Sequence, residues 1–350
     1  MTDAVADILL DWDDLRGRDL PWRRPRDPYR IWLSEVILQQ TRVAQGLGYY
    51  LRFTERFPDV ASLAAASEDE VLKLWQGLGY YNRARNLLAA AREVVARFGG
   101  EFPRTFDEVR SLRGVGDYTA AAICSAAYDL PCAVVDGNVY RVLSRLYDLA
   151  DPIDTTAGRR LFAELARQLL DEHAPGRYNQ AIMDFGALVC TPASPACGEC
   201  PLRDRCRSRE AGTVTMRPVK QGRTAVRDRW FHYLHITSKD RTLLCRREGR
   251  DIWQGLYEFP LLETPAKADF EALLAMPRFG ELLGGTAWRR LRTIPLPKHQ
   301  LSHQTIHATV YRIETPVLTP QAARLAVPAA TVGEYALPRL LDRYLTVCQM

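Results

Sequence analysis

Two acidic side chains stand in settings that suit acid–base chemistry. Glu35 lies within the apolar run 31–38 on an expected helix, where burial would raise the pKa of its carboxyl group and keep it protonated, as a general acid near neutral pH requires. A glutamate at a helix edge, facing water or paired with Arg42, explains the same pattern. Asp136 directly precedes an expected helix, where aspartate is a common N-cap; a carboxylate fixed there is immobile and ionised and could stabilise a nearby cation.

Four of the eight cysteines fall within a short stretch, with six, two and five residues between neighbours: Cys190, Cys197, Cys200 and Cys206. Four thiolates this close repel one another unless a cation shares them, and four sulfurs suit either zinc or an iron–sulfur cluster. The spacing leaves both metals open, because only one C-x2-C pair is present. No export signal is evident, so a disulfide framework is not expected. We expect inert core thiols at the remaining four: Cys124, Cys132, Cys245 and Cys348.

A glycine turn joins two expected helices at 112–119. Gly114 and Gly116 allow a tight turn with positive φ and leave backbone N–H groups exposed. The helix that opens at Asp117 aims its N-terminus at the same place, so the turn could bind an anion without regard to base sequence. An ordinary glycine turn between helices is the alternative.

Composition places the chain among globular proteins. It has 350 residues, 47% hydrophobic and 25% charged, which excludes disorder, collagen and coiled coil for the whole chain. No run of about 18 apolar residues predicts a membrane span, and the acidic start lacks the features of a secretory signal. The net charge of +5 is a weak indication of a polyanionic partner. Nine basic and three acidic residues between Arg203 and Arg229 fit either DNA or a solvated linker.

Hydrophobic periodicity predicts a mostly α N-terminal region over 1–210 and a smaller α+β domain over 228–350, with a linker at 211–227. The expected helices are Ala61–Leu74, Ala84–Phe98, Asp117–Tyr128, Asn138–Tyr147, Thr156–Glu172, Ala266–Ala275 and Leu337–Thr346. The expected strands are Trp230–Ile236, Arg241–Arg246 and Ala308–Ile313.

Short motifs surround these features in a fixed order. They are Leu20–Arg23, Trp32–Thr41, Gly77–Tyr81, Gly114–Gly116, Val135–Val139, Trp253–Pro260 and Leu301–His303. Together with the clustered cysteines, they resemble the adenine DNA glycosylases of the MutY family over nearly the whole chain. The resemblance implies a helix–hairpin–helix glycosylase domain with a [4Fe–4S] cluster on the four clustered cysteines, followed by a Nudix-like lesion-recognition domain. It also implies that the glycine turn clamps a phosphate.

The chemistry implied by this resemblance is hydrolysis of the N-glycosidic bond of adenine mispaired with 8-oxoguanine or guanine in double-stranded DNA, after the adenine is flipped from the stack. Glu35 would protonate the adenine and help to deprotonate water, and Asp136 would stabilise the oxocarbenium-like sugar. Asn138 would orient Asp136, and Tyr118 would lie near the sugar. Sister enzymes that cut the strand carry lysine where Tyr118 stands, so we expect base excision without strand scission.

DNA contacts are implied at several further positions. Gln40 and Tyr80 match residues that intrude into the duplex at the lesion, and Thr41 is a further expected DNA-binding residue. Trp22 and Arg23 match the region of the adenine pocket and of nearby DNA contacts. Core packing is the alternative for Tyr80 and the neighbouring Tyr81.

The C-terminal region is expected to bind rather than to hydrolyse. Its candidate helix carries only Asp269 and Glu271, whereas Nudix hydrolases hold Mg²⁺ on a glutamate-rich helix. Ser302 and His303 match the loop that contacts 8-oxoguanine; His299 is a weaker match. The family's phenylalanine is replaced here by Leu301, which offers no aromatic stacking and predicts weaker lesion preference. In the hairpin, Arg113 replaces the usual proline.

Three other functions fit the sequence less well than adenine excision. Tyr118 and the C-terminal domain disfavour an endonuclease-III-like pyrimidine-lesion glycosylase with lyase activity. Two candidate carboxylates disfavour a catalytically silent DNA-binding protein, and the missing acidic helix disfavours a Nudix hydrolase. We expect a monomer that is cytoplasmic and associated with the nucleoid.

Overall fold

The computed structural model describes residues 3–222 and 225–348. The chain divides into two compact units, one formed by Met1–Ala65 and Asn86–Gly222 and the other by Ala66–Arg85 and Arg223–Met350. The described part of the expected linker is fastened to the first unit: the Ile153 N–H donates to the Val219 carbonyl at 3.1 Å. Within the described ranges, no helix is both long and apolar enough to cross a membrane.

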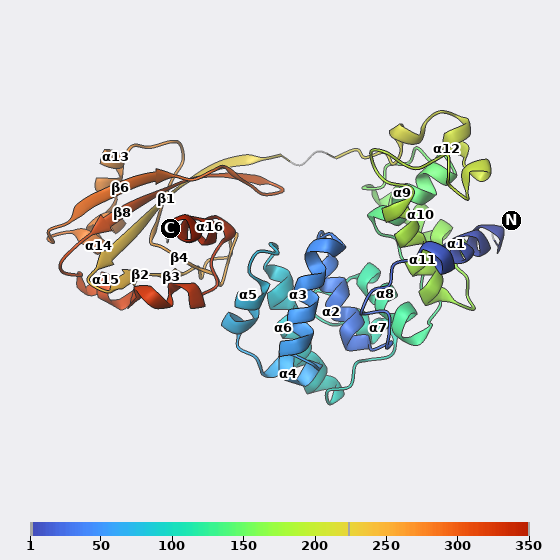
Figure 1. Ribbon diagram of the computed structural model, residues 1–350, viewed down its shortest axis with the longest axis horizontal. Coiled ribbons are helices and arrows are strands. Elements are labelled where there is room, and N and C mark those ends of the chain that lie inside the picture. Colours follow the sequence, from blue (N-terminus) through green and yellow to red (C-terminus); the bar gives the residue numbers. More distant parts are fainter. Residues whose placement is uncertain (1–2, 223–224, 349–350) are drawn as a thin grey trace. The chain divides into compact units, whose positions relative to one another are not determined.

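Helices build the first unit (Figure 1). They are α1 (Asp3–Arg16), α2 (Pro28–Leu38), α3 (Val43–Arg56), α4 (Val60–Ala65), α7 (Phe106–Arg110), α8 (Asp117–Tyr128), α9 (Gly137–Leu146), α10 (Thr156–Leu169), α11 (Pro175–Leu188) and α12 (Arg207–Glu210), with the short 3-10 turns η1 (Arg203–Arg205) and η2 (Val214–Met216). Helix α6 (Asn82–Phe98) begins in the second unit and continues in the first. Apolar faces of α1, α8, α9, α10 and α11 share one core, which includes Leu9, Ala121, Val142, Phe162 and Phe185.

Local capping explains where the site-bearing helices begin. Asp27 accepts a hydrogen bond from the Tyr29 N–H, and Pro28 occupies the first position of α2, where a missing N–H costs nothing. Asp136 caps α9 by accepting from the N–H groups of Asn138 and Val139. Caps of this kind contribute about 1 kcal/mol each. They fix the residue at which each helix starts, and therefore the direction of the side chains that follow.

The structure differs from the expected elements where a cap or a turn interrupts the periodicity. The single helix expected over 61–74 is divided into α4 and α5 (Glu68–Trp75), because the Ser67 hydroxyl accepts from the Glu70 N–H and starts a new helix. Helix α10 ends at Leu169, three residues before the expected end. The strand expected over 241–246 is broken at Leu244.

A mixed sheet forms the centre of the second unit (Figure 1). Its strands follow the order β6 (Arg289–Pro295), β8 (Gln304–Glu314), β1 (Arg227–Ser238), β2 (Arg241–Leu243) and β9 (Ala326–Pro328), with β5 (Leu261–Thr264) on β1 and β7 (His299–Gln300) on β8. Strands β1 and β8 are parallel, and the other pairs are antiparallel. A separate pair joins β3 (Cys245–Arg246) to β4 (Tyr257–Glu258).

Helices cover one face of this sheet. Leu234 and Ile236 of β1 pack with Phe270 in a core to which α13 (Phe270–Leu274), α14 (Pro277–Leu283) and α15 (Pro320–Arg324) contribute. The chain ends with η3 (Ala329–Glu334) and α16 (Arg339–Cys348). Asp269 caps α13 by accepting from the Ala272 N–H, so this acidic side chain has a structural partner.

Residues 66–85 group with the C-terminal sequence through polar contacts. Glu68 on α5 accepts from Arg246 at 2.9 Å, and Asp69 accepts from the Tyr257 hydroxyl at 3.1 Å. Gln76 donates to Asp342 at 2.8 Å. The periodicity of the sequence did not indicate this grouping, because contacts between distant segments leave no helical or strand pattern.

Candidate active site

Glu35 lies on α2 within a stretch that is buried from Ile31 to Ile37. Its side chain is 8% exposed, and this burial raises the pKa of the carboxyl group to about 7. The Tyr118 hydroxyl donates to Oε2 at 3.0 Å and opposes the rise, whereas the charge of Asp136 adds to it. A carboxyl group with this pKa exchanges a proton near neutral pH.

Asp136 is partly buried at the start of α9 and is held by three donors. Oδ1 accepts from the backbone N–H groups of Asn138 and Val139, each at 2.8 Å, and Oδ2 accepts from the Asn138 side chain at 2.8 Å. Burial raises the pKa of Asp136 above its ordinary value, while these hydrogen bonds and the charge of Arg141 oppose the rise. These donors favour the charged form of Asp136, which is the form that can stabilise a nearby positive charge.

Tyr118 contacts Glu35 and lies within electrostatic reach of Asp136. It is the second residue of α8, and its hydroxyl lies 3.0 Å from Glu35 Oε2 and 3.6 Å from the sulfur of Met183. Burial, followed by the charges of Glu35 and Asp136, raises the pKa of Tyr118 well above its usual range, so the hydroxyl remains a neutral donor. The fold thus brings together a proton donor, an anion and a phenol from three helices, with no amine at the Tyr118 position.

The glycine turn forms a hairpin between α7 and α8. Gly114 has φ of +78°, and a Cβ there would lie 2.7 Å from Asn86 Cβ, so the position requires glycine. Gly116 has φ of −99° and caps α8 without any side-chain hydrogen bond; of the two glycines, only Gly114 uses the left-handed region. The first N–H groups of α8 have no partners within the helix, which leaves them available to an anion. The exposed Arg113 is held through its own N–H, which donates to Glu93 at 3.0 Å.

Trp22 and Arg23 have structural partners in the first unit. Trp22 is 4% exposed and packs edge-on against Tyr50, with ring centroids 5.0 Å apart. Arg23 forms an ion pair with Asp184 at 2.9 Å and donates to the Arg18 carbonyl at 2.6 Å. The guanidinium of Arg23 is therefore bound internally, and its predicted contact with DNA stays a prediction.

Gln40 and Tyr80 share an unusual geometry, each within its own unit. Gln40 is exposed with φ of 58°, and Tyr80 is 49% exposed with φ of 47°. Positive φ is uncommon outside glycine and often marks a functional position. Thr41 is partly buried, next to Gln40. Tyr81 is 6% exposed and accepts from the Gly77 N–H at 3.2 Å, so core packing explains Tyr81 and not Tyr80.

Ser302 and His303 occupy the tip of the β7–β8 hairpin. Both are exposed, and the Ser302 hydroxyl lies 3.1 Å from His303 Nδ1. Leu301 is partly exposed beside them. His299 lies on β7 and contacts Trp253 edge-on, with ring centroids 5.7 Å apart, so it stands at the base of the hairpin rather than at its tip.

The four clustered cysteines lie in the loop that follows α11, and all are partly exposed. Their charges interact: burial, and then the neighbouring thiolates, raise the pKa of Cys200 to about 11. Within residues 3–222 and 225–348, no three Cys, His, Asp or Glu side chains are gathered as one metal ion would hold them. The four cysteine sulfurs lie within electrostatic reach of one another. Four soft sulfur ligands are chemically suited to an iron–sulfur cluster or to zinc.

The other cysteines follow a different pattern. Cys124 is fully buried, and burial raises the pKa of its thiol to about 12, as an inert core thiol requires. Cys132 and Cys245 are partly buried. The side chain of Cys348 lies outside the described residues.

Sequence reasoning did not single out two buried charged residues of the first unit, Asp184 and Arg141. Asp184 on α11 is fully buried and binds Arg18 through three hydrogen bonds of 2.5 to 3.0 Å. The sequence could have indicated a buried Asp184, because this residue lies in an apolar run as Glu35 does. Arg141 donates to Asn138 Oδ1 at 2.8 Å and to the Cys190 carbonyl at 2.6 Å. It therefore joins the side chain that holds Asp136 to the cysteine loop.

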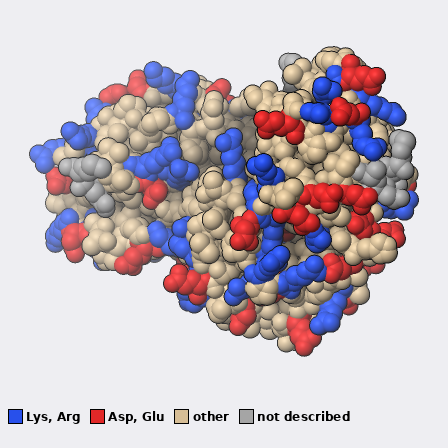
Figure 2. Space-filling view, turned by 45° about the vertical axis from the view of Figure 1, so that its right-hand side comes forward, with Lys and Arg blue, Asp and Glu red and all other residues tan. Residues whose placement is uncertain are grey.

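Charged side chains of both signs occupy the face of the molecule shown in Figure 2. On this face, charge therefore does not single out a binding surface.

Comparisons with family models cover both regions of the chain. Residues 33–168 match the HhH-GPD superfamily base excision DNA repair proteins, and residues 232–347 match the NUDIX domain. Among solved structures, a thermostable thymine-DNA glycosylase has a TM-score of 0.56 and 29% identity, covering 60% of this chain and 97% of that one. An endonuclease III–DNA complex, at 24% identity and a TM-score of 0.52, shows the same fold over 61% of this chain and 98% of that one.

Curated relatives extend the match. The adenine DNA glycosylase of Mus musculus is 48% identical over 58% of this chain, and the chain spans about two fifths of the length of the mammalian relatives it matches. Adenine DNA glycosylases of two Buchnera aphidicola subspecies, Schizaphis graminum and Baizongia pistaciae, are each 32% identical. The matches cover 75% and 85% of this chain and 76% and 83% of those proteins. The expected fold class is confirmed, and the chain belongs to the adenine DNA glycosylase family, the MutY family.

Proposed function

We propose that this protein is a monofunctional adenine DNA glycosylase of base excision repair. It removes adenine mispaired with 8-oxoguanine or guanine from double-stranded DNA. The observation that carries the proposal is the pairing of a buried Glu35, whose pKa of about 7 suits proton transfer, with Asp136, which three N–H donors hold. The family relationship supports adenine as the base.

The proposed mechanism uses these two carboxyl groups in different protonation states. Protonated Glu35 donates to the flipped adenine and makes it a better leaving group, and the sugar then gains oxocarbenium character. Asp136 stabilises that positive charge electrostatically while Asn138 keeps its orientation. Glu35, now ionised, accepts a proton from the attacking water, and the Tyr118 hydroxyl stabilises this carboxylate by hydrogen bonding.

Excision proceeds without strand scission in this proposal. A Schiff base with the sugar needs an amine, and the Tyr118 position supplies a phenol whose pKa is raised far above neutrality. Borohydride reduction should therefore trap no covalent adduct with DNA.

DNA binding is assigned to both units. The hairpin at Gly114 and Gly116 offers free N–H groups to a phosphate. The exposed Gln40 and Tyr80 enter the duplex at the lesion, and the tip of the β7–β8 hairpin reads the base opposite the adenine. The proposed domains are a glycosylase domain over 1–210, a linker over 211–227 and a lesion-recognition domain over 228–350, acting as a monomer in the cytoplasm at the nucleoid.

The cysteine loop is assigned a structural cofactor. Cys190, Cys197, Cys200 and Cys206 would hold a [4Fe–4S] cluster, which would replace thiolate repulsion by iron–sulfur bonds and rigidify the loop. Arg145 contacts this loop already, because its guanidinium donates to the Cys190 sulfur at 3.4 Å.

A single assay separates adenine excision from the alternatives. Duplexes that contain adenine opposite 8-oxoguanine, adenine opposite guanine, or thymine glycol opposite adenine are incubated with the protein, with alkali added to half of each sample. We expect strand cleavage only after alkali and only with the adenine mispairs. Cleavage without alkali, or at thymine glycol, would instead favour the lyase alternative.

Matched variants assign the roles. Glu35→Gln and Asp136→Asn should abolish or greatly reduce adenine release while duplex binding persists, whereas Glu164→Gln, on the exposed face of α10, should keep full activity. Ser302→Ala should lower the preference for 8-oxoguanine over guanine more than the rate of excision. Full activity in either carboxyl variant removes that residue from the mechanism.

A further inference from the structure

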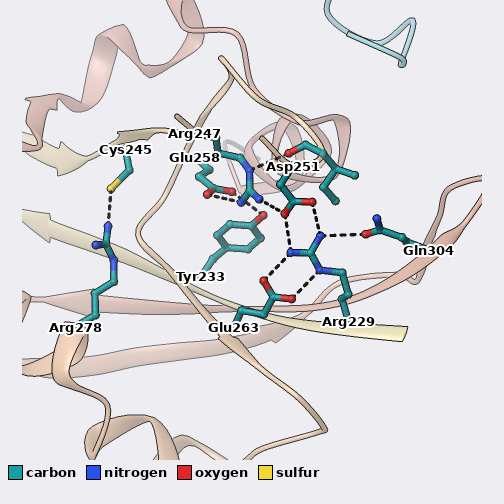
Figure 3. Close-up of polar contacts among 10 residues, drawn as sticks. Arg229, Tyr233, Cys245, Arg247, Asp251, Glu258, Glu263, Arg278 and Gln304 are labelled. Carbon is teal, nitrogen blue, oxygen red and sulfur yellow. Dashed lines mark hydrogen bonds and ion pairs between the residues drawn. The ribbon is translucent and has the colours of Figure 1, made fainter. Parts of the chain in front are cut away.

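A buried polar cluster in the second unit lies outside the candidate active site (Figure 3). Its centre is Arg229 on β1, whose side chain is 8% exposed although its guanidinium is permanently charged. The guanidinium donates twice to Glu263, at 2.7 Å each, and twice to Asp251, at 2.9 and 2.7 Å. Nη1 also donates to the side-chain oxygen of Gln304 at 3.0 Å. One guanidinium therefore joins three separate segments of the chain.

A second arginine fastens the loop 247–256. Arg247 donates to Asp251 at 3.0 Å, to Glu258 at 2.7 Å and to the Ile252 carbonyl at 3.0 Å. Glu258 also accepts from the Tyr233 hydroxyl at 3.1 Å. Asp251 is thus shared between the two guanidinium groups, and the loop is held by the same cluster that holds Gln304 (Figure 3).

Both strands of the β7–β8 hairpin rest on this cluster. On the β8 side, Gln304 is 4% exposed and directly follows the hairpin tip. On the β7 side, His299 contacts Trp253, a residue of the fastened loop with φ of 60° whose ring also packs against Phe231. The structure therefore ties each strand of the hairpin to the Arg229 cluster by a different route, β8 beside the tip through Gln304 and β7 through His299.

The tip of the hairpin has few contacts of its own. The Ser302 hydroxyl and the His303 ring contact each other, the Leu301 N–H donates to the Gln304 carbonyl at 2.8 Å, and the Arg227 N–H donates to the His303 carbonyl at 3.2 Å. Because both side chains at the tip are exposed, the strand residues that flank the tip largely decide the direction in which they point.

We propose that Arg229 is a positioning residue for recognition of the base opposite the target adenine. Its planar fork holds Gln304 and, through Asp251, the loop that carries Trp253, and it thereby sets the geometry of Ser302 and His303. A buried ion pair contributes little net stability compared with apolar packing, whereas a bidentate guanidinium fixes direction. The inference rests on the proposed function, in which this tip reads 8-oxoguanine.

Variants of Gln304 test the link without disrupting the ion pairs. In Gln304→Leu, Arg229 Nη1 keeps its hydrogen bond to Asp251, so no buried charge loses all its partners. Gln304→Glu restores an acceptor for the guanidinium and serves as the conservative rescue. Arg229→Lys keeps the positive charge but loses the guanidinium that forms bidentate hydrogen bonds. The matched control is Arg289→Lys, because Arg289 is 74% exposed and pairs only with Glu314 among the ion pairs of the described residues.

Two measurements are made on the full chain. The first is the ratio of affinities for duplexes that carry an uncleavable adenine analogue opposite 8-oxoguanine or opposite guanine, together with single-turnover adenine release. The second is hydrogen–deuterium exchange of the amides in 299–306, which requires no DNA. We expect Gln304→Leu and Arg229→Lys to lower the affinity ratio by about tenfold, the loss expected when a hydrogen bond to a charged group is removed. Amide exchange in the hairpin should accelerate in these two variants, whereas their rate of adenine release opposite guanine should stay at the wild-type value. Gln304→Glu and Arg289→Lys should match the wild-type protein in all of these measurements.

The outcomes distinguish this inference from the proposed function. If the wild-type protein discriminates between the two duplexes, an unchanged affinity ratio in both variants overturns the positioning role. An equal loss of affinity for both duplexes also overturns it, because it would indicate a general structural effect. A wild-type protein that releases no adenine, or that does not discriminate, refutes the proposed reading function. In that case the exchange data alone test whether Arg229 positions the hairpin. Faster exchange of the hairpin amides in Gln304→Leu supports this role, and unchanged exchange overturns it.

Discussion

Replacing Glu35 by glutamine removes an ionisable group from a buried site while keeping its shape and an oxygen that accepts from Tyr118. Folding raises the pKa of Glu35 from 4.5 to about 7. Below about pH 4.5 both folded and unfolded states are protonated, and the carboxyl group contributes no pH dependence. Between the two values, the folded state holds a proton that the unfolded chain has released, so stability falls as the pH rises. Above about pH 7 the loss is complete.

The size of this loss follows from the shift. One pKa unit corresponds to about 1.4 kcal/mol, so a rise from 4.5 to about 7 costs the wild-type protein about 3 kcal/mol at pH 8 relative to pH 4. Glu35→Gln carries no such cost. We expect the variant to be inactive and yet more stable than wild type by about 3 kcal/mol at pH 8, with the difference vanishing toward pH 4.

Pulse-labelled hydrogen exchange across a urea series measures this difference in the full chain, because peptides from α2 report the first unit separately from the second. Glu164→Gln is the control, since the pKa of Glu164 is lowered to about 2 by its contacts with Arg167 and Gln168 and its removal should not stabilise the protein at pH 8. A stability difference between wild type and Glu35→Gln that is the same at pH 5 and pH 8 would refute a buried, proton-holding Glu35.

Three further outcomes test other parts of the site. Tyr118→Phe removes the hydrogen bond that favours ionised Glu35, so the alkaline limb of the pH profile of adenine release should move upward; an unmoved limb contradicts the contact. Gly114→Ala places a Cβ against Asn86 at positive φ and should weaken duplex binding and reduce the salt dependence by about one phosphate contact, as measured by fluorescence anisotropy; wild-type affinity would separate the hairpin from DNA binding. Asp184→Asn leaves two partly buried arginines without their anion and should destabilise the first unit by about 1–3 kcal/mol; a thermal melt or exchange profile that is unchanged would contradict this.

Local pattern was sufficient for several parts of the protein. The apolar run around Glu35 indicated a buried carboxyl group, and the position of Asp136 before a helix indicated a cap; both are found. These inferences succeed because burial periodicity and capping depend on residues within a few positions of one another. The same locality explains why the expected helix over 61–74 was wrong: a serine cap within a helical pattern is a weak signal.

Choices among chemically similar neighbours could not be made in this way. Tyr80 and Tyr81 are adjacent and identical in type, yet one is exposed at positive φ and the other is buried. Arg23 remains a predicted DNA contact, and no local pattern indicated that its guanidinium also binds Asp184, which is 161 positions away in the numbering. Such pairings depend on which helices pack together, and no local pattern encodes them.

The sequence by itself determined the helical and α+β regions, the two candidate carboxyl groups, the tyrosine in place of a lysine and the cysteine loop, because each is expressed in residue type and short-range spacing. Only the tertiary structure decided that Tyr118 contacts Glu35, that residues 66–85 group with the C-terminal sequence, and that Arg229 joins three segments beside a hairpin. A pKa or a side-chain direction depends on distances between segments far apart in the chain, and those distances exist only once the chain has folded.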